Sequence, residues 1–171
     1  SEKDKIAYLN KMEKEIQQYE AENKTGNRIL DTILTTKSLN CQEKNIQMTC
    51  VADGKALDFV NPMDICSIFG NALDNAITSA EKVENPERRL IHVTVSQEKS
   101  FLRIKIENSF QGVLKMKNQL PITTKEDRRY HGFGLKSMKE IAEKYKGSMT
   151  VSAKDGWFEL RILIPLPESE K

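Results

Sequence analysis

The sequence lacks the features that mark membrane-spanning, disulfide-stabilised and nucleic-acid-binding proteins. It has three cysteines in 171 residues, Cys41, Cys50 and Cys66, an odd number without a Cys-x-x-Cys spacing, which argues against a disulfide framework or a zinc site. No apolar run approaches the length of a membrane span. A net charge of +2 is too small to indicate a nucleic-acid partner. What remains is a globular domain whose thiols suit the reducing cytosol.

Periodicity divides the chain into a helical front segment and an α/β body. Residues 3–23 contain no glycine or proline, so they suit an uninterrupted helix. The apolar seam of this helix is thin, as in dimerisation helices, and consists of Ile6, Leu9, Met12, Ile16 and Tyr19. Thr25-Gly26-Asn27 interrupts the pattern, and a second helix is expected over residues 27–45. We therefore divide the chain into residues 1–26 and residues 27–171.

The body alternates between strand and helix patterns. Asn61 followed by Pro62 predicts the start of a helix that runs to about residue 82, and the helical pattern returns at residues 138–145. Residues 108–130 are polar and predict a long loop. Alternating apolar residues predict strands over 46–51, 90–97, 101–107, 148–153 and 157–165. The expected fold class is α/β: a two-layer sandwich with helices on one face of a mixed sheet, preceded by a helical segment.

Two asparagines and two glycines carry the chemistry. Asn71 and Asn75 are four residues apart, so both amides project from one side of the expected helix. An amide oxygen is a suitable ligand for Mg²⁺, which usually also binds phosphate oxygens. Gly132 and Gly134 form a turn before a helix, where backbone N–H groups and the helix dipole favour an anion. The spacing is not that of a Walker loop. The two motifs together predict a magnesium-nucleotide site.

Arranged in this order, the motifs resemble the ATP-binding domain of the GHKL superfamily (gyrase, Hsp90, histidine kinase, MutL). Within it, the chain is most similar to sensor histidine kinases of the quorum-sensing, peptide-responsive type. The resemblance spans about residues 27–167 and implies a Bergerat-type ATP-binding fold. Its motifs are an N-box, Asn71-Ala-Leu-Asp-Asn75-Ala, a glycine box, Gly132-Phe-Gly134-Leu135-Lys136-Ser137, and a lid containing Thr123-Thr124-Lys125 before His131.

The resemblance implies ATP and Mg²⁺ as cofactors and assigns a role to each matching residue. Asn75 is the implied Mg²⁺ ligand, and Asn71 the implied contact to phosphate or to metal-bound water, so both are candidate catalytic residues. Asn108 takes the place of the acidic adenine contact in the Asp-x-Gly-x-Gly turn of the family, and Phe110 replaces its first glycine. The implied nucleotide contacts are Asn71, Asn75, Asn108, Gly112, Thr124, Lys125, His131, Gly132, Phe133, Gly134, Leu135 and Lys136.

The N-box also favours one reaction over another. ATP-hydrolysing relatives carry a glutamate base where this chain has Asn71, and a neutral amide cannot accept a proton. The resemblance therefore implies transfer of the γ-phosphoryl group to a histidine on a dimerising two-helix hairpin. The chain's two histidines, His92 and His131, lie outside the front helix. We expect residues 1–26 to be the remnant of that hairpin, and the phosphoacceptor to lie outside this chain.

The resemblance also implies the cellular setting. A kinase of this type would be a homodimer at full length, would act on a response regulator and would form the cytoplasmic domain of a membrane-anchored sensor. No nucleic acid is expected as a partner. One alternative stays open: a non-catalytic regulator of the same fold, such as a pseudokinase or a partner-binding module. The replacement of the acidic adenine contact by Asn108 favours this alternative.

Overall fold

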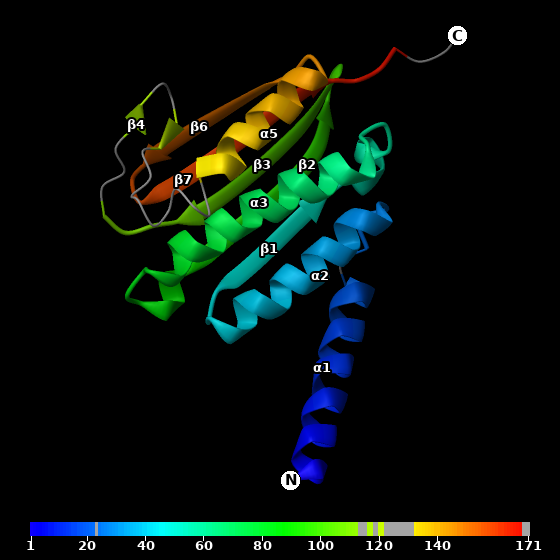
Figure 1. Ribbon diagram of the computed structural model, residues 1–171, viewed down its shortest axis with the longest axis vertical. Helices are drawn as coiled ribbons and strands as arrows, with labels where there is room; N and C mark the ends of the chain where they lie inside the picture. The colour runs from blue at the N-terminus through cyan, green and yellow to red at the C-terminus, as the bar shows by residue number, and fades with distance from the viewer. Residues whose placement is uncertain (23, 113–115, 118–119, 122–131, 169–171) are drawn as a thin grey trace.

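The computed structural model is a two-layer sandwich in which helices α2, α3 and α5 cover one face of a mixed sheet (Figure 1). The structure describes residues 1–22, 24–112, 116–117, 120–121 and 132–168. The helices are α1 (Glu2–Glu22), α2 (Arg28–Glu43), α3 (Pro62–Glu81) and α5 (Gly132–Lys144), with short 3₁₀ helices at Gly54–Leu57 and Pro86–Arg88. The strands are β1 (Gln47–Ala52), β2 (Leu90–Glu98), β3 (Phe101–Ser109), β4 (Met116–Lys117), β5 (Leu120–Pro121), β6 (Ser148–Lys154) and β7 (Trp157–Pro165).

The predicted fold class is confirmed. The sheet has the strand order β1-β2-β3-β7-β6. Strand β1 runs parallel to β2, and the other neighbouring strands are antiparallel. Strands β6 and β7 are joined at Asp155 and Gly156, which have φ values of 55° and 80°. Two positive φ values in a two-residue connection match the right-handed twist of a hairpin. The chain thus ends with a hairpin whose second strand, β7, pairs with β3 near the middle of the sheet.

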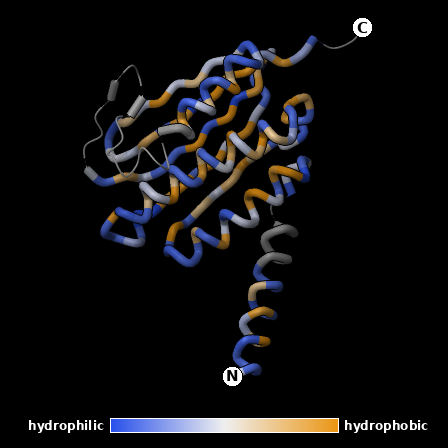
Figure 2. The backbone as a smooth tube through the Cα atoms, viewed as in Figure 1, coloured by the Kyte–Doolittle hydropathy of each residue, from blue (hydrophilic) through white to orange (hydrophobic). Residues whose placement is uncertain are grey.

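The core lies between the sheet and the helices, and it fixes α3 in place. Alternate residues of β2 and β3 face the helices and are buried, as a strand with one covered face requires. Apolar residues recur along α3 and the central strands (Figure 2). Burial of each large aliphatic or aromatic side chain contributes about 1.5–3 kcal/mol. The α3 side chains in this core are Ile65, Ile68, Phe69, Ala72, Leu73, Ala76, Ile77 and Ala80. Because α3 is anchored along its length, polar residues on its remaining face have fixed positions.

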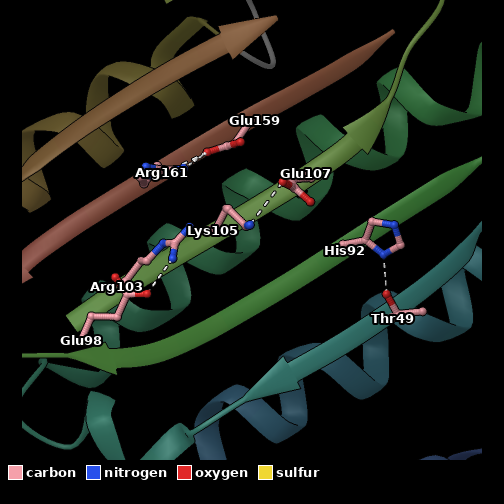
Figure 3. Close-up of polar contacts among 8 residues, drawn as sticks. All are labelled: Thr49, His92, Glu98, Arg103, Lys105, Glu107, Glu159 and Arg161. Carbon is pink, nitrogen blue, oxygen red and sulfur yellow. Dashed lines mark hydrogen bonds and ion pairs between the residues drawn. The ribbon is translucent and has the colours of Figure 1, made fainter. Parts of the chain in front are cut away.

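The other face of the sheet carries polar and charged side chains (Figure 3). Lys105 lies opposite Arg161 in the strand register, and Glu107 lies opposite Glu159. Like charges therefore oppose each other across the strands, which is unfavourable. The ion pairs form along each strand instead, Lys105 with Glu107 at 3.4 Å and Arg161 with Glu159 at 2.7 Å. His92 lies on this face, where it contacts Thr49.

Two predicted boundaries are wrong. Strand β3 extends to Ser109, because its ladder with β2 and β7 continues through Asn108. Asn108 therefore lies in a strand and not in the predicted loop, and β4 and β5 also interrupt that loop. Helix α5 begins at Gly132, so the two glycines form its first turn, whereas the sequence predicted a turn followed by a helix from residue 138. The packing of α5 against α3 outweighs the low helix propensity of glycine.

Helix α1 extends away from the sandwich (Figure 1). Three of its apolar side chains, Ile6, Tyr8 and Leu9, are 58%, 58% and 61% exposed. Within the described residues, no helix combines the length and apolar character needed to cross a membrane. The three cysteines are free thiols: Cys41 is buried, Cys50 is partly buried and Cys66 is exposed.

Candidate nucleotide site

Helix α3 presents the amide of Asn71 in a defined orientation. The helix begins as the sequence predicts: the Asn61 side chain accepts a hydrogen bond from the Met63 N–H at 2.9 Å, and Pro62 is the first helical residue. Asn71 Nδ2 donates to the Ser67 carbonyl at 2.7 Å, with Ser67 Oγ at 3.3 Å. The amide nitrogen is thus held by the preceding turn of α3.

The Asn71 oxygen lies against the first turn of α5. A Cβ added to Gly134 would come 3.2 Å from Asn71 Oδ1 and 3.4 Å from Asn71 Cβ and Cγ. Gly134 is buried, and the absence of a side chain there allows the two helices to approach this closely. The structure therefore brings together two motifs that are about sixty residues apart in the sequence.

The start of α5 is suited to an anion. The N–H groups of the first turn of a helix have no partner within the helix, and the helix dipole places partial positive charge there. No acidic residue lies in the first turn of α5. The Leu135 side chain packs in the core, so only its backbone could contact a ligand, whereas Lys136 is exposed. Phosphate groups are the anions that most often bind such helix starts in nucleotide-binding proteins.

Asn108 lies at the end of β3, on the helix-covered face of the sheet. It is 2% exposed and continues the row of buried β3 residues Leu102, Ile104 and Ile106. Its Nδ2 donates to the Ser109 carbonyl at 2.9 Å. The amide oxygen of Asn108 can only accept a hydrogen bond, and an adenine amino group needs an acceptor of this kind.

The structure places some of the predicted site residues and not others. Asn75 lies one turn after Asn71 on α3 and is half-buried. Gly112 has a φ of 100°, and a Cβ there would meet no other atom within 4 Å. Gly132 and Phe133 belong to the first turn of α5. Thr124, Lys125 and His131 lie outside the described residues.

The sequence prediction missed Ser67, which orients Asn71 through the two contacts described above. Its position four residues before Asn71, on the same face of α3, was the available signal. Asp74, the neighbour of Asn75, forms an ion pair with Lys37 of α2. This pairing turns the Asp74 carboxylate toward α2, whereas the Asn71 oxygen faces α5.

Comparison with known structures places the fold among histidine kinase catalytic domains. The catalytic domain of histidine kinase ThkA is similar with a TM-score of 0.62 and 20% identity, over 82% of this chain and 93% of that chain. For the histidine kinase AdeS of Acinetobacter baumannii, the values are 0.59 and 14%, over 96% and 80%. Full-length ShkA in complex with AMPPNP gives 0.58 and 15%, over 84% and 30%. At these identities the likeness establishes the fold.

The sequence comparison then defines the family. Residues 60–165 match the GHKL domain family, a region that includes α3, the central strands and α5. The chain therefore belongs to the GHKL family, and its fold resembles that of histidine kinase catalytic domains. A comparison with curated proteins finds no match. The quorum-sensing, peptide-responsive subtype stays a prediction.

Proposed function

We propose that this chain binds Mg-ATP and is the catalytic part of a sensor histidine kinase, which transfers the γ-phosphoryl group to a histidine outside the chain. The contact between Asn71 Oδ1 and the Gly134 position carries the proposal. It sets an amide-bearing helix beside the start of a second helix, and the two together offer oxygen ligands and N–H donors. A magnesium-bound triphosphate needs both kinds of group.

The residues present are suited to this cofactor. Gly134 leaves a space that a Cβ would fill, directly beside an amide oxygen. Asn75 would hold Mg²⁺, Asn71 would contact phosphate or metal-bound water, and the backbone N–H groups from Gly132 onward would hold the terminal phosphates. The metal would neutralise phosphate charge. Asn108 Oδ1 would accept a hydrogen bond from the adenine amino group. The further contacts proposed at Gly112, Thr124, Lys125, His131, Phe133, Leu135 and Lys136 complete the set.

The neutral Asn71 favours phosphoryl transfer to a positioned nucleophile over hydrolysis of ATP. An amide cannot accept a proton from water near neutral pH, and Ser67 holds the Asn71 nitrogen so that its oxygen faces α5. Catalysis then depends on the position of the phosphates and on the neutralisation of their charge. His92 cannot receive the phosphoryl group in this arrangement, because it lies on the sheet face opposite the helices.

The proposal extends to the protein's assembly and partners. Residues 1–26 are proposed as the remnant of a dimerisation hairpin, followed by the catalytic domain over residues 27–171. The exposure of Ile6 and Leu9 supports a seam that a second subunit covers in a full-length homodimer. A response regulator is the proposed phosphoryl recipient after the histidine. We also propose that the domain is cytoplasmic and belongs to a membrane-anchored sensor.

One observation favours a second candidate, a non-catalytic regulator of the same fold. The family's acidic adenine contact is replaced by Asn108, and a neutral acceptor makes a weaker hydrogen bond than a carboxylate. A domain of this kind would bind nucleotide weakly or not at all, and it would act through partner binding.

Calorimetric titration of the 171-residue chain with Mg-ATP and Mg-ADP tests the proposal. We expect saturable binding, a rise in Tm with nucleotide concentration, and loss of both in Asn75→Ala. Asn10→Ala, in an exposed position of α1, is the matched control. No Tm shift at millimolar nucleotide would favour the regulator.

The location of the phosphoacceptor has a separate test. Labelled γ-phosphate should not be incorporated into this chain when it is incubated with Mg-ATP. Phosphorylation of the isolated chain would contradict an acceptor histidine outside it.

A further inference from the structure

Helices α3 and α5 contact each other at Gly134, and hydrogen bonds join the two helices at the opposite end of α5. Tyr145 directly follows the last residue of α5, and its hydroxyl donates to Asp64 Oδ2 at 2.6 Å. The same hydroxyl accepts a bond from the Asn61 backbone N–H at 2.9 Å. Asn61 is the cap of α3 and Asp64 lies in its first turn. One side chain therefore binds both the cap and the first turn of α3.

This junction is well suited to hold a fixed geometry. The Tyr145 ring packs edge-on against Phe59, with ring centroids 6.2 Å apart and an interplanar angle of 82°. Lys144 Nζ lies 2.6 Å from the same Asp64 oxygen. Desolvation opposes ionisation of Asp64, but the hydrogen bonds from Lys144 and Tyr145 outweigh it and lower the pKa of Asp64. Burial and the bond to Asp64 raise the pKa of Tyr145. A neutral hydroxyl thus donates to a carboxylate, which is a strong arrangement.

Directional contacts decide where α5 lies along α3. The apolar side chains under α5, Leu135, Met138 and Ala142, hold the helix onto the core, but hydrophobic burial has no preferred direction. A slide or rotation of α5 would break the bonds of Tyr145 at one end and change the contact between Gly134 and Asn71 at the other.

We infer that Tyr145 and Asp64 form a positioning lock, which sets the alignment of α5 on α3 and thereby the distance between Asn71 and the phosphate-binding start of α5. Both are positioning residues, since they act through the two helices without touching the nucleotide. The inference rests on the proposed function, because its effect is a change in nucleotide affinity. Asn108 lies on β3 and not on α5, so the adenine end of the site is independent of the lock.

The test uses calorimetric titration of the 171-residue chain with Mg-ATP, at a temperature where circular dichroism shows each variant to be folded. Tyr145→Phe removes the hydroxyl and keeps the ring on Phe59, and Asp64→Asn weakens the acceptor. Each should raise the Kd for Mg-ATP about three- to tenfold, in the range for substitutions that act on a site without touching its ligand. The rise in the double variant should be smaller than the product of the two single rises, because both substitutions act on the bond between Tyr145 and Asp64.

Two controls separate the hydroxyl bond from other effects. Tyr8→Phe makes the same chemical change at an exposed site on α1 and should leave the Kd unchanged. Lys144→Gln removes the cation but keeps the bond from Tyr145 to Asp64. Its Kd should stay within about twofold of that of the unsubstituted chain, because the lysine is exposed and its charge is screened by solvent. A full effect in Lys144→Gln would overturn the assignment of the lock to the hydroxyl.

The outcomes distinguish this inference from the proposed function. If the unsubstituted chain does not bind Mg-ATP, both fall. If it binds, and Tyr145→Phe and Asp64→Asn bind equally well despite a lower Tm, the function stands and the lock is overturned, because the junction then serves stability alone. Kd values in the double variant that multiply the two single effects would also contradict a shared interaction.

Discussion

Replacing Gly134 with alanine should leave the stability of the chain nearly unchanged and weaken nucleotide binding. The new Cβ would lie 3.2 Å from Asn71 Oδ1, a few tenths of an ångström closer than most such contacts. Alanine is favoured over glycine inside a helix by about 1 kcal/mol, which offsets the crowding. We expect the free energy of unfolding to change by less than about 1 kcal/mol, which corresponds to less than about 2–4 °C in Tm for a chain of this size.

Nucleotide binding should respond far more strongly to Gly134→Ala. The methyl group pushes Asn71 out of place, and it occupies the space beside the first N–H groups of α5. We expect the Kd for Mg-ATP to rise at least about tenfold, equivalent to about 1.4 kcal/mol. Thermal unfolding followed by circular dichroism and calorimetric titration measure the two effects on the same sample.

Gly70 offers a matched control for this experiment. It lies on α3 next to Asn71, and a Cβ there would meet no other atom within 4 Å. Gly70→Ala should stabilise the chain by about 0.5–1 kcal/mol and leave the Kd unchanged. An unchanged Kd in Gly134→Ala, or an equal loss of affinity in both variants, would refute the reasoning.

Three further predictions follow from other contacts. Gly147→Ala should lower the free energy of unfolding by about 2–4 kcal/mol, because the added Cβ would lie 2.2 Å from the backbone oxygen of Leu163; an unchanged urea midpoint would contradict this. The pKa of Asp64 lies below its ordinary value of 3.8, so its stabilising effect is present above that pH and is lost as pH falls through the lowered pKa. Asp64→Asn should therefore show a smaller fall in Tm on acidification below about pH 4, and an equal fall would disprove the assignment. Burial raises the pKa of the Cys41 thiol to about 11, so a thiol reagent at neutral pH should modify the exposed Cys66 first and Cys41 only on unfolding; early loss of the Cys41 thiol would refute this.

Local patterns predicted most elements of the fold, because each pattern reports a local physical preference. The alternation over residues 90–97 and 101–107 predicted β2 and β3, since one face of each strand is buried. Asn61 and Pro62 predicted the start of α3, because a cap and a first-turn proline act within a few residues. The start of α5 at Gly132 could not be predicted in this way. Its glycines disfavour a helix, and the contact that compensates comes from a distant segment.

The geometry of the candidate site was predictable in kind but not in arrangement. The residue types of Asn71 and Gly134 indicated their chemistry, whereas the orientation of the Asn71 amide depends on Ser67 and on the approach of α5. The bond between Tyr145 and Asp64 joins residues 81 positions apart. A single sequence does not show that two residues so far apart along the chain are in contact. A tyrosine and an aspartate near helix ends are also usually solvated, so neither residue indicated a buried bond.

In the proposed site, the adenine end and the phosphate end would depend on different parts of the fold, and this difference gives a way to distinguish a kinase from a regulator. Asn108 is fixed by the β3 ladder, independently of α5, whereas the phosphate end needs α3 and α5 in alignment. A regulator that has lost nucleotide binding would need neither the close contact of Gly134 at the start of α5 nor the hydrogen-bonded junction of Tyr145 at its end. In the proposed site, asparagine in place of an acidic residue at position 108 would weaken only the adenine contact. We therefore expect the affinity of this chain to come mainly from the phosphates, so that removing the γ-phosphate weakens binding more than replacing Asn108 with alanine. The reverse order in a titration series would favour the regulator.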